Sequence, residues 1–241
     1  MRVIICENYD EMSKEGAKIV ASQITLKPDS ILGLATGSTP IGLYKNLIEL
    51  NKNKEIDFSC VKSFNLDEYY PISRENDQSY FYFMNDNLFN HVNIDKNNTH
   101  VPNGETKNAE EECKNYDKMI DKAGGIDLQI LGIGQNGHIA FNEPDKNLIT
   151  GTHVTSLTQN TIEANSRFFN DISEVPTKAL TMGIGSIMKA KKIIILINGE
   201  NKHAALKELL NENITTDIPA TLLKVHPDVV LICDKAAYYG K

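Results

Sequence analysis

The chain has 241 residues, a formal net charge of −7 at pH 7 and a hydrophobic content of 41%. Its acidic balance, with no basic stripe along the sequence, excludes a general nucleic-acid binder. No apolar run is long enough for a secretory signal or a membrane span, so we expect a cytoplasmic protein without a membrane partner. The length suffices for one substantial core, and we expect residues 1–241 to form a single domain.

Short apolar runs alternate with helical patterns along the chain. The runs predicted as strands are Val3–Cys6, Ser30–Ala35, Val61–Leu66, Asp127–Leu131, Lys192–Asn198 and Val229–Cys233. The patterns predicted as helices fall at 10–25, 40–50, 76–90, 106–123, 158–169 and 201–212. Continuously apolar, β-branched strands between helices indicate an α/β fold: a doubly wound, mainly parallel sheet with helices on both faces. In such sheets, ligands bind at the loops that leave the carboxyl ends of the strands.

The first of these loops, ATGSTP at 35–40, has the composition of an anion site. Gly37 lets the backbone approach a ligand closely, and Pro40 is predicted at the first helical position with Ser38 or Thr39 as the N-cap. Free N–H groups, hydroxyls and a helix N-terminus together favour a bound phosphate, although an ordinary capped helix start fits this loop equally well. The Walker A pattern is excluded, because no Gly-Lys-Ser/Thr follows.

The second loop, FNLDEYY at 64–70, places two adjacent carboxylates, Asp67 and Glu68, at a strand end among aromatic residues. Aromatic surroundings can remove water from a carboxylate and raise its pKa, which makes it a better base. The alternative is a carboxylate that caps a helix or stabilises a turn.

The third loop, LGIGQNGHIAFNEPD at 131–145, contains a G-x-G-x-x-G pattern that is typical of dinucleotide sites. Such a site needs a long helix after the third glycine and an acidic residue about twenty positions further on. Here Pro144 interrupts within seven residues of Gly137, and Leu157 falls near the position of the acid. We therefore exclude NAD as a cofactor.

Asn136, His138 and Glu143 remain as the chemical groups of the third loop. An imidazole titrates near neutrality, so His138 can take or give a proton, and Glu143 can orient and stabilise the imidazolium. No Ser or Cys nucleophile lies in the motif, so acyl transfer is not indicated. A metal site shared with Asp67 is also not expected, because H-x-x-x-x-E is not a known ligand spacing and the four cysteines lie far apart.

The fourth loop, NGENK at 198–202, leads into a helix whose first turn contains Lys202. A lysine there opposes the helix dipole, and an anionic ligand would offset that cost. Arg167 lies among apolar residues, where an arginine needs a carboxylate or phosphate partner. A surface lysine and a structural ion pair are the alternatives.

Taken together, these segments resemble the glucosamine-6-phosphate deaminase family over nearly the whole chain. The matching motifs are LATGSTPIGLY, FNLDEYY, LGIGQNGHIAFNEP, ANSRFF, VPTKALTMGIGSI and NGENKHAAL. The resemblance implies a modified Rossmann-like fold and an enzyme of amino-sugar catabolism that needs no cofactor. It also implies the reaction, in which glucosamine 6-phosphate is isomerised and deaminated by water to fructose 6-phosphate and ammonia.

The resemblance also implies roles for individual residues. Asp67 matches the base that moves a proton from C2 to C1, and His138 matches the acid/base group for ring opening, supported by Glu143 and Asn136. The phosphate-binding set that the resemblance implies is Thr36, Gly37, Ser38, Thr39, Arg167 and Lys202.

Two departures from the family pattern are visible. Many relatives carry Asp where this chain has Asn136, and an amide can orient its neighbours but cannot take a proton. The longer, hexameric relatives are activated by N-acetylglucosamine 6-phosphate through basic residues in a segment that reads LITGTHVT at 148–155 here, without Lys or Arg. We expect no such activation, and an allosteric hexamer is disfavoured, while the choice between a monomer and another homo-oligomer stays open.

Two other functions fit parts of the pattern. A 6-phosphogluconolactonase shares the fold and the phosphate site, but its reaction does not need a proton transfer at C2 by Asp67. A sugar-phosphate sensor would bind the sugar without turning it over, and it would normally add a helix-turn-helix segment for which 241 residues leave no room.

Overall fold

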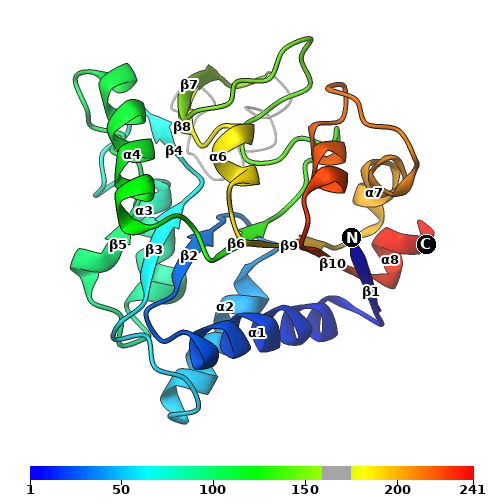
Figure 1. Ribbon diagram of the computed structural model, residues 1–241, viewed down its shortest axis with the longest axis horizontal. Coiled ribbons are helices and arrows are strands. Elements are labelled where there is room, and N and C mark those ends of the chain that lie inside the picture. The colour runs from blue at the N-terminus through cyan, green and yellow to red at the C-terminus, as the bar shows by residue number, and fades with distance from the viewer. Residues whose placement is uncertain (159–174) are drawn as a thin grey trace.

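A computed structural model describes residues 1–158 and 175–241 of the chain. Its centre is a seven-stranded sheet that crosses the molecule in Figure 1. In spatial order the strands are β1 (Arg2–Cys6), β10 (Val229–Asp234), β9 (Lys192–Ile197), β6 (Leu128–Leu131), β2 (Ile31–Leu34), β3 (Lys62–Asn65) and β5 (Thr99–His100). All neighbouring strands are parallel, which confirms the predicted mainly parallel sheet.

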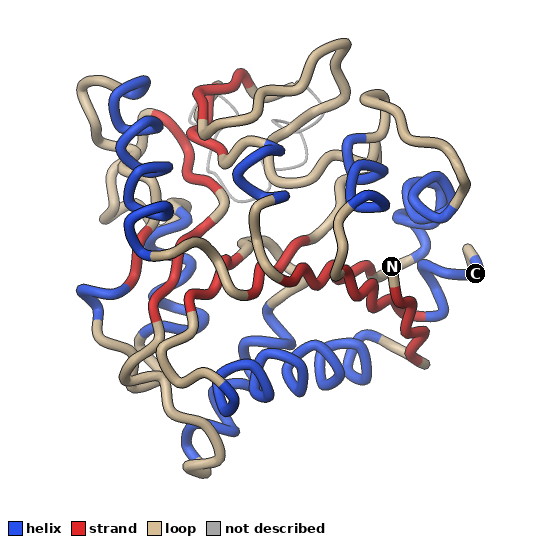
Figure 2. Tube along the Cα trace, viewed as in Figure 1, coloured by secondary structure: helices blue, strands red, loops and turns tan. Residues whose placement is uncertain are grey.

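Helices lie on both sides of this sheet, as predicted. Figures 1 and 2 show the helices α1 and α2 below the sheet and the helices α6 and α7 above it. The α-helices are α1 (Tyr9–Leu26), α2 (Ile41–Lys52), α3 (Tyr80–Met84), α4 (Ala109–Ala123), α6 (Ile184–Met188), α7 (His203–Leu210) and α8 (Lys235–Tyr239). The remaining helical turns are η1 (Asn85–Phe89), η2 (Lys96–Asn98), η4 (Glu200–Lys202) and η5 (Pro219–Val225). Among the described residues, none of these helices combines the length and apolar content that crossing a bilayer requires.

The central strands are apolar throughout because both of their faces are covered. Every residue of β2, β6 and β10 is buried, and so is all of β9 except Lys192. This continuous burial explains why the apolar runs in the sequence predicted these strands.

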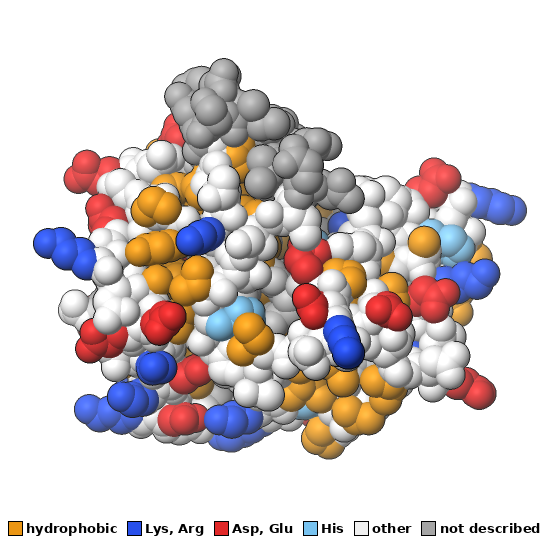
Figure 3. Space-filling model, turned by 90° about the horizontal axis from the view of Figure 1, so that it is seen from above, with side chains coloured by type: hydrophobic (Ala, Val, Ile, Leu, Met, Phe, Trp, Pro, Cys, Tyr) orange, Lys and Arg blue, Asp and Glu red, His pale blue; other side chains and the backbone are white. Residues whose placement is uncertain are grey.

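Charged side chains of both signs are interspersed on the face drawn in Figure 3, and the described side chains there form no continuous basic stripe.

A second sheet of three strands was not predicted. It consists of β4 (Asp67–Tyr70), β8 (Lys178–Thr181) and β7 (His153–Ser156), in the antiparallel order β4-β8-β7. Only Leu66 separates β3 from β4, so the chain passes directly from the large sheet to the small one. The interpretation of residues 67–70 as a loop was therefore wrong, since Asp67–Tyr70 pairs with a strand more than 100 residues away.

The predicted helices agree with the structure in part. The pattern at 76–90 contains a short α-helix, α3, that continues as the π-helix η1, and the pattern at 201–212 contains η4 followed by α7. The predicted helix at 158–169 lies outside the described residues, apart from its first position.

Candidate active site

Four adjacent strands bring the four predicted loops to one edge of the large sheet. The strands β9, β6, β2 and β3 are neighbours in that order and run parallel, so their carboxyl ends lie side by side. One direct contact joins two of the loops: the hydroxyl of Thr39 donates to the amide oxygen of Asn198 at 2.8 Å. The structure thus places the candidate anion loop beside the loop that leads to Lys202.

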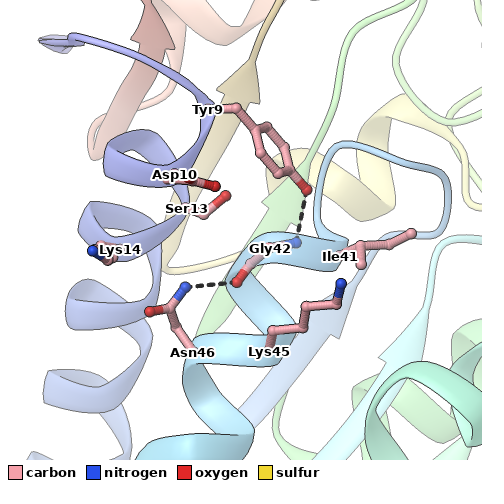
Figure 4. A pocket seen from close by; sticks show the side chains of 8 residues that line it. All are labelled: Tyr9, Asp10, Ser13, Lys14, Ile41, Gly42, Lys45 and Asn46. Carbon is pink, nitrogen blue, oxygen red and sulfur yellow. Dashed lines mark hydrogen bonds between the residues drawn. The ribbon is translucent and has the colours of Figure 1, made fainter.

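The loop at 35–40 is held from behind by a tyrosine of α1. The hydroxyl of Tyr9 donates to the carbonyl oxygen of Ser38 at 3.0 Å and accepts from the N–H of Gly42 at 2.8 Å. Figure 4 shows the ring of Tyr9 reaching from α1 to the first turn of α2. The tyrosine thereby satisfies a backbone donor that a helix start leaves open. Gly37 has a φ of 95°, a conformation that favours glycine.

The predicted capping of α2 was wrong. Pro40 occupies the N-cap position itself, and the helix begins at Ile41. The side chain of Pro40 makes no capping hydrogen bond. The Thr39 hydroxyl donates to Asn198 instead, and the N–H of Gly42 donates to the hydroxyl of Tyr9.

A cavity of about 220 Å³ lies between α1 and α2, and none of the predicted catalytic residues lines it (Figure 4).

Asp67 is the first residue of β4 and is only 6% exposed. Burial, with a further contribution from the charge of Glu68, raises the pKa of Asp67 to about 8. No hydrogen bond from the described part of the chain stabilises its carboxylate. A carboxyl group in this state can act as a general base near neutral pH.

Glu68 has a different environment from its neighbour. Its carboxylate accepts three backbone N–H bonds, from Tyr69 at 2.9 Å and from Tyr80 and Phe81 at 2.8 Å each. Burial raises the pKa of Glu68 to about 7, although these three donors and Arg74 favour its ionised form. Of the two adjacent carboxylates, Glu68 binds the first N–H groups of α3, whose N-cap is Ser79, and Asp67 is the group available for chemistry.

The loop after β6 brings Asn136, His138 and Glu143 together. The Nδ1 atom of His138 lies 3.1 Å from Oε1 of Glu143, although the ring is not oriented for a well-aligned hydrogen bond. Nδ2 of Asn136 donates to the other Glu143 oxygen at 2.6 Å, and Oδ1 of Asn136 accepts the N–H of His138 at 3.3 Å. The side chains of His138 and Glu143 are 24% and 13% exposed, so a small substrate can reach the imidazole.

Glycine is required where this loop turns under the imidazole. A Cβ atom added at Gly134 would lie 2.4 Å from the His138 ring, and Gly137 has a φ of 83°. The carbonyl of Gly137 also accepts the N–H of Ala220 at 2.9 Å, which fixes the turn against η5. The G-x-G-x-x-G pattern therefore shapes a loop around a histidine, which is a different use from a dinucleotide site.

Thr181 connects this loop to Asp67. It is the direct partner of Asp67 in the β4–β8 pair, and its hydroxyl accepts the N–H of Phe141 at 3.1 Å. The amide of Asn142 donates to the carbonyl oxygens of Ile139 and Met182, which adds a second bond between loop and strand. Sequence reasoning missed both Thr181 and Asn142, because their partners are 40 residues away along the chain.

Lys202, at the end of η4, is half-buried, and burial lowers its pKa. No carboxylate of the described residues forms an ion pair with it. Arg167, the other predicted cation of the phosphate site, lies outside the described residues.

No group of three or more His, Cys, Asp and Glu side chains within 1–158 and 175–241 is arranged to hold a metal ion.

Comparison with known proteins identifies the family of the chain. The model of the family described as glucosamine-6-phosphate isomerases and 6-phosphogluconolactonases matches residues 7–231. A glucosamine-6-phosphate deaminase from Clostridium beijerinckii is 61% identical over 235 residues, which cover 98% of this chain and 97% of the relative. Another, from Thermoanaerobacter pseudethanolicus, is 60% identical over 98% of this chain and 94% of its own.

Solved structures give the same result. A monomeric glucosamine-6-phosphate deaminase superimposes with a TM-score of 0.97 at 43% identity, over the full length of both chains. A 6-phosphogluconolactonase from Thermotoga maritima shares the fold, with a TM-score of 0.76 at 23% identity over 97% of this chain and 99% of its own. The chain therefore belongs to the family of glucosamine-6-phosphate isomerases and 6-phosphogluconolactonases.

Proposed function

We propose that this protein is a cytoplasmic glucosamine-6-phosphate deaminase of amino-sugar catabolism, with residues 1–241 acting as one domain. The observation that carries the proposal is the position of Thr181, which pairs with Asp67 and hydrogen-bonds the loop that bears His138 and Glu143. This link supports a single site that contains a buried carboxyl base and an imidazole–carboxylate pair. The relatives at about 60% identity carry this activity in their names.

The first step is opening of the sugar ring. His138 moves a proton from the C1 hydroxyl to the ring oxygen, and the carboxylate of Glu143 stabilises the imidazolium that forms in between. Asn136 is a positioning residue, since its amide holds one Glu143 oxygen and leaves the other for the imidazole. The product is the open-chain aldehyde, in which the hydrogen on C2 is acidic.

The second step is the isomerisation. Asp67 takes the proton from C2 and returns it to C1, which leaves an imine at C2. Water adds to that carbon and ammonia leaves, giving fructose 6-phosphate. General acid–base catalysis of this kind contributes about 10²–10⁴-fold to each step, and it needs a base whose pKa lies near the working pH, as the pKa of about 8 for Asp67 does.

The phosphate group of the substrate supplies binding energy away from the reacting carbons. The groups proposed to hold it are the backbone and hydroxyls of Thr36, Gly37, Ser38 and Thr39, together with Arg167 and Lys202. Lys202 supports this assignment because its half-buried ammonium group is left without a carboxylate partner among the described residues. An anion there would also face the N-terminal end of α2.

An ammonia-release assay tests the proposal. Glucosamine 6-phosphate should release ammonia, whereas its N-acetyl analogue should release none, because an amide nitrogen cannot form the imine. The Asp67→Asn variant should open the ring at the normal rate but release no ammonia, and Asp77→Asn, a change at an exposed carboxylate, should behave like the unmodified protein. Hydrolysis of 6-phosphogluconolactone without ammonia release would favour the lactonase, and binding without turnover would favour a sensor.

A further inference from the structure

Glu68 is 1% exposed, and the proposed reaction gives it no proton to carry. Its Oε1 accepts the N–H groups of Tyr69 and Tyr80, and its Oε2 accepts the N–H of Phe81. A carboxylate at a helix start satisfies open backbone donors and complements the helix dipole. Glu68 therefore ties the strand β4 to the first turn of α3.

The first turn of α3 carries the ring of Tyr80 into an aromatic cluster. The ring centroid of Tyr80 lies 4.7 Å from that of Tyr69 and 6.2 Å from that of Phe141, with the Phe141 ring nearly parallel to it. These side chains pack in one buried cluster with Ala179 of β8. Tyr69 lies two residues from Asp67 and so shares its face of β4. The cluster thus covers the strand face that bears the proposed base.

We propose that Glu68 is a positioning residue, which holds the first turn of α3 so that Tyr80 packs against Tyr69 and Phe141 and keeps water from the Asp67 carboxyl. This inference rests on the proposed function, because it assigns Glu68 a part in preparing the base of that reaction. Glu68 acts through the backbone of Tyr80 and does not itself touch the substrate.

The enclosure determines how strongly Asp67 holds its proton. Within the described residues no hydrogen bond reaches its carboxylate, so burial is the main cause of its raised pKa. Admitting water would stabilise the ionised form and lower that pKa. The described titratable groups that interact electrostatically with Asp67 are Glu68 on β4, Tyr80 on α3 and Tyr116 on α4.

Two variants separate the position of Glu68 from its charge. Glu68→Asp keeps the carboxylate but is one methylene too short to reach the N–H groups of Tyr80 and Phe81. Tyr80→Leu keeps Glu68 and its bonds but removes the ring. Glu75→Asp is the matched control, since Glu75 is exposed and its carboxylate holds no backbone group among the described residues.

Two readouts follow the base in the full-length protein. The first is the acid limb of the pH profile of kcat/KM for ammonia release. The second is the pKa of Asp67 from NMR titration of ¹³C-labelled aspartate carboxyls, assigned with Asp67→Asn, which needs no turnover. In each of the variants Glu68→Asp and Tyr80→Leu, the acid limb and the pKa of Asp67 should move to lower pH by about one unit. Such a shift is a tenfold decrease in the proton affinity of Asp67. Glu75→Asp should leave both unchanged.

Several results would overturn the inference. If Glu68→Asp leaves the Asp67 titration in place while Glu68→Gln moves it, Glu68 acts through its charge alone. If Glu68→Asp does not fold, an unshifted Asp67 titration in Tyr80→Leu still contradicts the proposed enclosure. Failure of the unmodified protein to release ammonia would instead contradict the proposed function, and the NMR titration would then test the role of Glu68 by itself.

Discussion

The hydroxyl of Tyr9 donates a hydrogen bond of 3.0 Å to the carbonyl oxygen of Ser38, 29 residues away. The same hydroxyl accepts the N–H of Gly42. One side chain of α1 therefore fixes both the loop proposed to bind phosphate and the first turn of the helix behind it. Because the phosphate is remote from the reacting carbons, this contact bears on substrate binding more than on the chemical step.

Tyr9→Phe should accordingly raise KM for glucosamine 6-phosphate by about three- to tenfold and leave kcat within about twofold. The change removes two hydrogen bonds from an otherwise intact ring, and a bond of this kind contributes a net ~0.5–1.5 kcal/mol. Steady-state kinetics and calorimetric titration with inorganic phosphate would measure the effect. Tyr82→Phe, at a tyrosine that is 44% exposed, is the control. An unchanged KM with a reduced kcat would contradict this role for Tyr9.

Asn136→Asp should add an ionisation to the pH profile of the enzyme. The Asn136 amide lies 2.6 Å from the Glu143 carboxylate, and two carboxyl groups at that distance share one proton, so one of their pKa values rises strongly. While the proton is shared, the pair has the same charge and the same hydrogen bond as the amide and carboxylate, and kcat should stay within about tenfold. At higher pH the carboxyl pair loses the shared proton and carries two negative charges. The pH profile of kcat should then depart from that of the unmodified protein. Superimposable profiles would show that Asn136 does not affect the ionisation of the site.

The sequence predicted six of the seven strands of the large sheet, because these strands are recognisable without knowledge of their partners, whereas the two-residue strand β5 (Thr99–His100) was missed. β2, β6 and β10 are buried along their whole length, so their apolar runs need no alternation to be found. His138 and Glu143 could also be paired in advance, since they lie on one short loop. A local signal of this kind accounts for the prediction that these two side chains lie close together.

The small sheet could not be found in the same way. Asp67–Tyr70 forms a strand only because Lys178–Thr181 lies beside it, and a four-residue polar and aromatic segment gives no sign of that pairing. The capping of α2 was missed for the same reason, because the group that serves Gly42 is a tyrosine 33 residues earlier. Contacts between distant segments also hide Thr181, which links β4 to the loop that bears His138.

Asp127→Asn should lower the free energy of unfolding at neutral pH by about 1–3 kcal/mol. The Asp127 side chain is buried directly before β6, where it accepts the N–H of Ile31 at 2.8 Å and pairs with Lys191 and Lys27 at 2.8 and 3.1 Å. Burial by itself would raise its pKa, but these partners hold the pKa below its ordinary value. The stabilisation is therefore present above the unfolded pKa of about 3.9 and is lost as pH falls through the lower, folded value.

Urea unfolding at several pH values would measure this difference. The gap between the Asp127→Asn variant and the unmodified protein should be constant from pH 7 to about pH 5 and should narrow below pH 4. Asp121→Asn removes an exposed carboxylate that lies 3.6 Å from Lys189, and it should change stability by less than about 1 kcal/mol. A gap that widens on acidification would show that Asp127 is protonated in the folded protein.

N-acetylglucosamine 6-phosphate should not activate this enzyme. The segment 148–155 contains neither Lys nor Arg, and its backbone is already bonded to neighbouring elements. The carbonyls of Ile149 and Thr150 accept N–H groups from α6, and Thr152 bonds to Asp117 of α4 through both its N–H and its hydroxyl. An effector with a phosphate group would find no Lys or Arg on this segment and would have to break these bonds to move it. Saturation curves for glucosamine 6-phosphate should stay hyperbolic and unshifted at low effector concentrations, with only competition at the active site at high ones. A shift of half-saturation to lower substrate concentration on adding the acetylated sugar would contradict this prediction and would point to an effector site elsewhere on the molecule.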